Sequence, residues 1–198
     1  MTDTTLVFER EQAELAALTP PPTAHLLGTV LADVPLLDVN GSPVRLSAAV
    51  DRPAVFVLYR GAWCPFCNLT LRSYQQDLFP ELAARRMALV AISPQRPDGS
   101  LSMQEKNKLT FTVLSDPGNQ IASALGVLTA PSSEARSAQL ELGLDLETVN
   151  ADRTTALPLP TVLIVDTNRI IRWIDVRPDY SARTTPTDIL AALGSFET

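Results

Sequence analysis

Apolar residues in this chain gather in short runs, separated by segments in which they recur at helical spacing. The stretch Pro53 to Arg60 is apolar on both faces and rich in β-branched and aromatic residues, which predicts a central strand covered on both sides. Similar runs predict further strands at 87–93, 113–115 and 161–166. The sequence therefore predicts a buried sheet.

The segments between these runs have the apolar spacing of helices. One helix is predicted directly after Cys64, and Pro80 is expected to end or kink it. Others are predicted at 101–109, at 119–125 and after the N-cap residue Thr185. Strands that alternate with helices in this way predict an α/β fold of three layers, α/β/α, with a parallel core and right-handed crossovers.

Three segments add to this pattern. Residues 5–18 have a loosely helical spacing that stops at a triple proline, which predicts an N-terminal helical arm. The turn dipeptide Asn40-Gly41 predicts a β-hairpin at the start of the domain. Residues 129–157 lack a strand period and are interpreted as an inserted helix and loop. The predicted organisation is an arm with a proline-rich linker over residues 1–26 and one domain over residues 27–198.

The composition is that of a folded chain of 198 residues, 45% hydrophobic and 19% charged. It has 16 basic and 22 acidic residues and no run of basic residues to neutralise phosphates, so nucleic acid is not an expected partner. The apolar runs fall far short of the roughly 20 residues that span a bilayer, and no signal-peptide pattern is readable. We therefore expect a cytoplasmic protein without a membrane partner.

The two cysteines lie in the stretch Trp63-Cys64-Pro65-Phe66-Cys67, where the strand at 53–60 passes into a helix. Unpaired N–H groups and the dipole at a helix start stabilise a thiolate and lower its pKa from about 8.5. A second cysteine one turn further on can attack a mixed disulfide or a sulfenic acid formed on the first. The pair is therefore a candidate redox centre that cycles between dithiol and disulfide.

Two other roles are open to the cysteines. Half of a zinc site would need ligands that this chain lacks, since it has no second Cys pair and a single histidine, His25, so no metal is expected. Inert core cysteines would leave the flanking Trp63 and Pro65 and the position between strand and helix without an explanation. Redox chemistry is the interpretation that uses all of these features.

The sequence resembles a known superfamily. The Cys-x-x-Cys stretch with Leu159-Pro160-Thr161 directly before a strand resembles the thioredoxin fold. Other segments are similar to the peroxiredoxin superfamily of alkyl hydroperoxide reductase C and thiol-specific antioxidant proteins, above all to its members with a Cys-x-x-Cys pair. These segments are A-I-S-P at 91–94, L-T-F-T-V-L-S-D-P at 109–117, A-L-G-V at 124–127 and R-P-D-Y-S-A-R at 177–183.

The resemblance implies a thioredoxin-like domain, and we expect supporting residues around the catalytic Cys64 and Cys67, with packing in the core as the alternative role of Trp63. Those residues are Trp63, Pro65, Arg60, Leu159, Pro160 and Thr161. It implies a cis peptide bond before Pro160, which would bring the backbone of Leu159 against the sulfurs as an edge for a thiol substrate. It implies no cofactor, a peroxide or disulfide substrate, a thioredoxin-like or small-thiol reductant, and relatives that often form homodimers.

The chain also departs from the superfamily pattern. Where typical members have a Pro and a peroxide-orienting Thr before the peroxidatic cysteine, this chain has Arg60 and Cys64, followed by Cys67. Where those members have an activating Arg, this chain has Leu159 and Pro160. Arg60 could substitute for it, although a solvated charge at the strand end is an equal interpretation, and Arg153 is a weaker substitute.

Three functions follow from these observations. The first is reduction of peroxides by a dithiol that an external dithiol restores, the second is thiol–disulfide exchange without peroxidase activity, and the third is a redox-responsive binding protein. The thioredoxin register makes Cys64 the nucleophile, whereas the peroxiredoxin register makes it Cys67. We expect Cys64, because the helix start concentrates the dipole and admits solvent, while burial would raise the pKa of Cys67.

Overall fold

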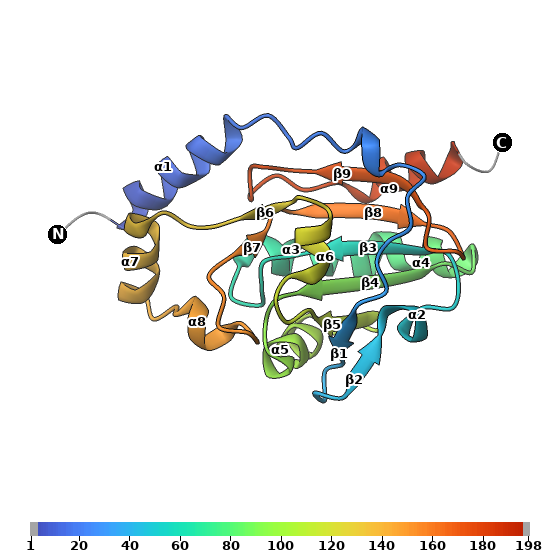
Figure 1. Ribbon diagram of the computed structural model, residues 1–198, viewed down its shortest axis with the longest axis horizontal. Helices are drawn as coiled ribbons and strands as arrows, with labels where there is room; N and C mark the ends of the chain where they lie inside the picture. Colours follow the sequence, from blue (N-terminus) through green and yellow to red (C-terminus); the bar gives the residue numbers. More distant parts are fainter. Residues whose placement is uncertain (1–3, 196–198) are drawn as a thin grey trace.

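A seven-stranded mixed sheet forms the centre of the computed structural model, which describes residues 4–195 (Figure 1). Its strand order is β2-β1-β5-β4-β3-β8-β9. The strands are β1 (Pro35–Leu37), β2 (Pro43–Arg45), β3 (Ala54–Leu58), β4 (Ala88–Ser93), β5 (Thr112–Ser115), β8 (Thr161–Val165) and β9 (Ile171–Val176). The first three residues of the predicted arm and the last three of the predicted domain lie outside the described residues.

Only the middle of the sheet is parallel. β3 pairs in parallel with β4, and β4 with β5, as predicted, but β8 runs antiparallel to β3, and β1 antiparallel to β5. The prediction of a parallel core is therefore right for three strands only. A short turn at Asn168 joins β8 to β9, and such a tight connection forces the two strands to be antiparallel.

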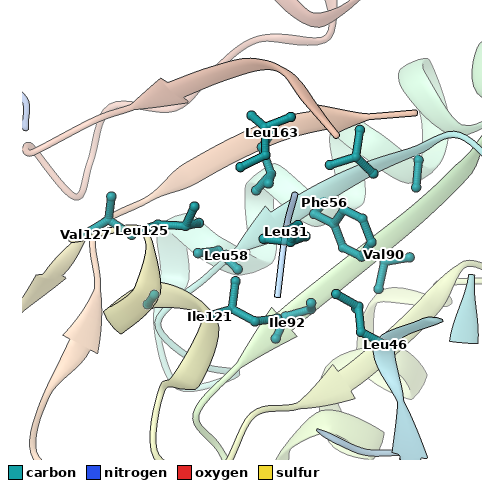
Figure 2. Close-up of a cluster of buried hydrophobic side chains, with 14 of the residues drawn as sticks. Leu31, Leu46, Phe56, Leu58, Val90, Ile92, Ile121, Leu125, Val127 and Leu163 are labelled. Atoms are coloured by element: carbon teal, nitrogen blue, oxygen red, sulfur yellow. The ribbon is translucent and has the colours of Figure 1, made fainter. Parts of the chain in front are cut away.

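Helices cover both faces of the sheet. They are α2 (Leu46–Ala49), α3 (Pro65–Ser73), α4 (Phe79–Ala84), α5 (Pro97–Asn107), α6 (Gln120–Ala124) and α9 (Pro186–Gly194), with the short 3-10 turn η1 (Ala24–Leu26). On one face Val55 and Val57 pack against side chains of α3, α5 and α9. On the other face Phe56 and Leu58 pack against α2, α6 and η1 (Figure 2). The predicted α/β/α layers are confirmed, and the alternation along β3 builds two separate cores.

The helix after Cys64 does not end at Pro80. α3 continues through a π-helical turn, η2 (Tyr74–Leu78), into α4. In the wide turn the N–H of Phe79 donates to the carbonyl of Tyr74, five residues back. Pro80 has no N–H to donate and takes its place in the first turn of α4, where that loss costs least. The prediction that this helix ends at Pro80 is therefore wrong, because the helix continues into α4.

The inserted segment and the arm pack together. The insertion holds α7 (Ser133–Glu141) and α8 (Leu146–Val149), and the short strands β6 (Leu128–Thr129) and β7 (Leu157–Pro158) pair at its base. The arm is α1 (Thr4–Ala16), which lies beside α7 (Figure 1). Val7 packs there against Ala135 and Ala138. The division at residues 26 and 27 stays a prediction, as do the boundaries of the domain.

The arm also reaches the loop before α9. The side-chain amide of Gln12 donates to Ser181 Oγ at 2.8 Å, and the hydroxyl of Tyr180 donates to the carbonyl of Phe8 at 3.2 Å. These contacts close α1 over the sheet end at which β3 passes into α3. No helix within residues 4–195 is long and apolar enough to cross a membrane.

Candidate active site

The two cysteines lie where β3 passes into α3. Cys64 is the N-cap of α3, Pro65 takes the first helical position, and Cys67 lies in the first turn. Both thiols are reduced and buried, with 2% of Cys64 and 1% of Cys67 exposed. Cys64 is thus almost as buried as Cys67, because the arm and the insertion cover this end of the sheet and leave only a cavity beside it.

Buried amides hold the cysteine loop in place. Asn68 donates to the carbonyls of Ala62 at 2.7 Å and Cys64 at 2.8 Å, and Asn107 donates to Asn68 at 2.8 Å. Gly61 is required nearby, because a Cβ there would lie 2.5 Å from the Trp63 indole nitrogen. The loop is thus fixed from α3, α5 and its own backbone, which keeps both sulfurs in a constant geometry.

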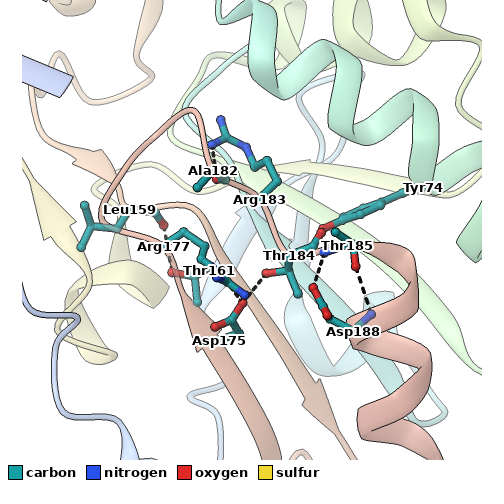
Figure 3. A network of polar contacts seen from close by, with 10 residues as sticks. All are labelled: Tyr74, Leu159, Thr161, Asp175, Arg177, Ala182, Arg183, Thr184, Thr185 and Asp188. Atoms are coloured by element: carbon teal, nitrogen blue, oxygen red, sulfur yellow. Dashed lines mark hydrogen bonds and ion pairs between the residues drawn. The ribbon is translucent and has the colours of Figure 1, made fainter. Parts of the chain in front are cut away.

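Arg183 is the charged group nearest to the sulfurs. One guanidinium nitrogen, Nη2, lies 3.5 Å from Cys67 Sγ and 4.0 Å from Cys64 Sγ. The other, Nη1, donates to the carbonyl oxygen of Tyr180 and to that of Ala182, which Figure 3 shows. Within residues 4–195 no carboxylate forms an ion pair with Arg183. Its charge is therefore available to a thiolate.

A polar network positions the segment that carries Arg183 (Figure 3). The hydroxyl of Tyr74 donates to the carbonyl of Thr184 at 2.6 Å. The hydroxyl of Thr184 donates to Asp175 Oδ2 at 2.8 Å, and Arg177 Nε donates to the same oxygen at 2.7 Å. The neighbouring residue Thr185 begins α9 with a capping box, as the sequence predicts for an N-cap. The network links the segment of Arg183 to η2, β9 and α9.

The thiols differ sharply in acidity. Burial by itself would raise the pKa of Cys67, but the hydrogen bond from the Cys64 thiol and the charge of Arg183 outweigh it and lower this pKa to about 5. The same hydrogen bond, followed by burial, raises the pKa of Cys64. The order is opposite to the expected one, because Arg183 and the Cys64 thiol both act on Cys67.

The cysteines also face different spaces. Cys67 lines a crevice of about 10 Å³, about the size of one water molecule, together with Pro160, Thr161 and Arg183. Cys64 lines a cavity of about 550 Å³ between the arm, the insertion and the cysteine loop. Trp63 and Pro65 line the same cavity.

The Arg60 side chain is neither in contact with the sulfurs nor solvated at the strand end. It is 5% exposed, and its guanidinium carbon lies 4.3 Å from the ring centre of Tyr180 and 5.3 Å from that of Trp63. It is therefore not a solvated charge, and its guanidinium forms cation–π contacts over the large cavity instead of a contact to sulfur. Its backbone N–H does help to lower the pKa of Cys67. Arg153 is exposed and lines a separate cavity beside Arg96.

The predicted cis peptide bond before Pro160 is wrong, since residues 4–195 contain no cis peptide bond. The backbone N–H of Leu159 donates to the carbonyl of Val127 at 2.8 Å, and its carbonyl accepts from the hydroxyl of Thr161 at 2.9 Å. The backbone N–H and carbonyl of Leu159 are therefore not available to pair with a substrate, because Val127 and Thr161 already bond to them. Pro160 and Thr161 do reach the site, as walls of the small crevice.

Arg183, Tyr74 and Asn68 belong to the site although no local sequence pattern predicts them. Arg183 ends the segment at 177–183 that carries part of the family resemblance, which was the one available signal. Arg183 and Cys67 lie 116 positions apart, so no local spacing connects them. Within the described residues no group of three or more His, Cys, Asp or Glu side chains could hold a metal ion.

Comparison with known proteins gives consistent relatives. Peroxiredoxin Q from chloroplasts of Sedum lineare is 30% identical over 92 residues, which are 46% of this chain and 49% of the relative. A putative peroxiredoxin of Haemophilus influenzae is 33% identical over 92 residues, which are 46% of this chain and 59% of the relative. The chain thus aligns with about half the length of these curated relatives.

Solved structures share the fold. The peroxidoxin BcpB of Mycobacterium tuberculosis superposes with a TM-score of 0.64 at 23% identity, covering 87% of this chain and 98% of that one. The alkyl hydroperoxide reductase C of Enterococcus faecalis gives 0.66 at 14% identity, covering 87% and 92%. The expected thioredoxin-like fold is confirmed. The AhpC/TSA family profile matches residues 27–174, and this chain therefore belongs to the AhpC/TSA family.

Proposed function

We propose that this protein is a thiol-dependent peroxidase in which Cys67 reacts with the peroxide and Cys64 resolves the product as a disulfide. The observation that carries the proposal is the guanidinium of Arg183, 3.5 Å from the sulfur of Cys67. With its pKa lowered to about 5, Cys67 is a thiolate at neutral pH. Only a thiolate attacks a peroxide at a useful rate.

In the first step the Cys67 thiolate attacks the terminal oxygen of the peroxide. The S–O bond forms while the O–O bond breaks, the leaving oxygen takes a proton and departs as an alcohol or water, and Cys67 becomes a sulfenic acid. Arg183 supports this step because a cation beside the reacting atoms stabilises the charge that moves onto the leaving oxygen. It would supply the guanidinium that the family pattern has before the third strand.

In the second step Cys64 attacks the sulfenic acid sulfur of Cys67. The S–S bond forms, hydroxide leaves and is protonated to water, and the product is one intramolecular disulfide. The two cysteines are one helical turn apart, and the chain has no other cysteine to compete. Two electrons from an external thiol reductant then restore both thiols, so the cycle needs no cofactor.

Burial of both sulfurs argues for this function over exchange with protein disulfides. A folded protein cannot bring its own disulfide to a sulfur that is 1 or 2% exposed, whereas a small peroxide needs only a narrow crevice. A solved structure with the same fold, from Vibrio vulnificus, holds hydrogen peroxide on a reduced peroxiredoxin. We further propose a cytoplasmic location, where a thiol reductant is available. A homodimer stays a prediction from the family resemblance.

The test is a single-turnover reaction of the reduced full chain with one equivalent of hydrogen peroxide or cumene hydroperoxide, beside an insulin-reduction assay. We expect loss of the peroxide, loss of both thiols and a monomer lighter by two hydrogens in mass spectrometry. Insulin reduction without peroxide consumption would replace the proposal with thiol–disulfide exchange. A disulfide-linked dimer as the main product would contradict the resolving role of Cys64.

A further inference from the structure

The cavity on the Cys64 side is the second chemical feature of this end of the molecule. Its volume of about 550 Å³ lies in the range of small-molecule sites, roughly 300–1,000 Å³. Its walls come from three separate parts of the chain: Phe8 and Glu11 from the arm, Leu142 and Leu144 from the insertion, and Cys64 with its loop. Cys67 is not among its lining residues.

Rings and aliphatic side chains dominate the cavity wall. Phe8, Phe66 and Tyr180 contribute rings, and Leu142 and Leu144 contribute aliphatic surface. Such a wall favours an apolar body, because its burial removes apolar surface from water on both sides.

The charged groups of the cavity select further among small molecules. Among the lining residues within 4–195, Glu9 and Glu11 stand against one cation, Arg60, whose guanidinium is engaged with the rings of Tyr180 and Trp63. An anionic ligand would meet one more negative than positive charge. The walls therefore favour a neutral molecule over an anionic one such as glutathione.

From this arrangement we propose that the cavity is the binding site of the reducing co-substrate, a small neutral dithiol with an apolar body, which attacks Cys64. The proposal rests on the peroxidase function above, since it concerns how the Cys64–Cys67 disulfide is reopened. The structure separates the two halves of the cycle: the crevice at Cys67 serves the peroxide, and the cavity at Cys64 serves the thiol.

The exchange balances as follows. One thiolate of the dithiol attacks Cys64 Sγ, the Cys64–Cys67 bond breaks, and Cys67 leaves as a thiolate beside Arg183. The second thiol of the same molecule attacks the sulfur of its own mixed disulfide, so that Cys64 leaves and takes up a proton. The dithiol becomes a cyclic disulfide and two electrons pass to the protein; counted from the neutral dithiol, one proton is released when its attacking thiol ionises.

Attack at Cys64 is also the chemically favoured direction. In thiol–disulfide exchange the sulfur with the lower thiol pKa is the better leaving group. That sulfur belongs to Cys67, and expulsion of Cys67 requires attack on Cys64. The position of the cavity and the direction of the exchange thus agree.

The test uses the oxidised full chain and two dithiols, dihydrolipoamide with an apolar body and dithiothreitol with a polar one. The disulfide is prepared with diamide, so the reductive reaction can be measured even if peroxide does not react. We expect dihydrolipoamide to reduce the disulfide with saturation and about tenfold faster than dithiothreitol or glutathione at equal thiolate concentration. Equal rates for all three thiols would overturn the proposal.

Two variants of the cavity wall sharpen this test. Leu142→Asp places a charge at a residue that is 66% exposed, and Leu144→Trp fills part of the cavity. Both should remove most of the advantage of dihydrolipoamide, whereas Leu140→Asp, at an exposed residue near the end of α7 that does not line the cavity, should keep it. If these variants slow oxidation by cumene hydroperoxide but not reduction by dihydrolipoamide, the cavity binds the peroxide instead and the proposal is wrong.

Discussion

The two cysteines occupy opposite kinds of environment although they are three residues apart. Cys67 faces a crevice of about 10 Å³, touches the guanidinium of Arg183 and has a pKa lowered to about 5. Cys64 faces a cavity of about 550 Å³ and has a raised pKa. The crevice is built from the sheet and its helices, and the cavity from the arm and the insertion.

This difference shows how the two cysteines of one Cys-x-x-Cys pair can have different chemical properties. The hydrogen bond from Cys64 and the charge of Arg183 together favour the thiolate on Cys67, whereas the open space lies beside Cys64. Acidity and access are usually found together on one cysteine at a helix start. Here the two properties belong to different cysteines. Arg183, from a distant segment of the chain, lies beside Cys67, whereas the cavity next to the arm lies beside Cys64.

Loss of the Cys67 thiol should have the largest effect on this division. Cys67→Ser should reduce peroxide consumption to the rate of free cysteine or below, because no low-pKa thiolate remains. Cys64→Ser should still consume one equivalent of peroxide and accumulate a sulfenic acid on Cys67, which dimedone traps. Stopped-flow mixing with hydrogen peroxide measures both. If Cys64 in the Cys67→Ser protein forms the trappable sulfenic acid, the roles are reversed.

Removal of the Arg183 charge should have the next largest effect. In Arg183→Met the pKa of Cys67 should rise from about 5 toward an ordinary thiol value, and alkylation by iodoacetamide at neutral pH should slow by at most about 30-fold, because the hydrogen bond from Cys64 still lowers this pKa. The thiolate is lost as pH falls through the folded pKa, so the rate of the natural protein should drop only near pH 5. Arg153→Met, far from the sulfurs, is the control, and an unchanged pH profile in Arg183→Met would contradict the role of Arg183.

The Tyr74 hydroxyl tests the positioning of Arg183 without touching a sulfur. Tyr74→Phe leaves the carbonyl of Thr184 without its donor, which should lower the free energy of unfolding by about 1 kcal/mol. We expect the alkylation profile of Cys67 to shift in the same direction as in Arg183→Met, but less. Urea unfolding and iodoacetamide titration measure the two effects. A stability loss with no shift of the profile would make Tyr74 a purely structural residue.

Glu11 should give the smallest effect, on the Cys64 side. Burial raises its pKa, and the charge of Arg60 opposes this only in part. A raised folded pKa means that stability falls as pH rises above the ordinary value of 4.5, until the folded carboxyl ionises. Glu11→Gln should therefore gain stability over the natural protein across that range, while the alkylation profile of Cys67 stays the same. Equal stability curves at all pH values would show that Glu11 is solvated.

The sequence determined the elements and the place of the chemistry. Apolar runs and helical patterns depend on neighbours in the chain, so β3, β4, β8 and the helix after Cys64 could be predicted from local residues. A cysteine pair between a strand and a helix can likewise be recognised from the local sequence. The α/β/α layers follow because a strand that is apolar on both faces must be covered on both.

Tertiary structure decided which cysteine is acidic and which is reachable. A pKa depends on charges within a few ångströms in space, and Arg183, 116 positions from Cys67, approaches it through Tyr74 and Asp175. The partner of Leu159 likewise comes from Val127, which removed the expected substrate edge. Access to Cys64 depends on how the arm packs on the insertion. None of these contacts leaves a periodic signal, because each joins residues whose spacing along the chain is arbitrary.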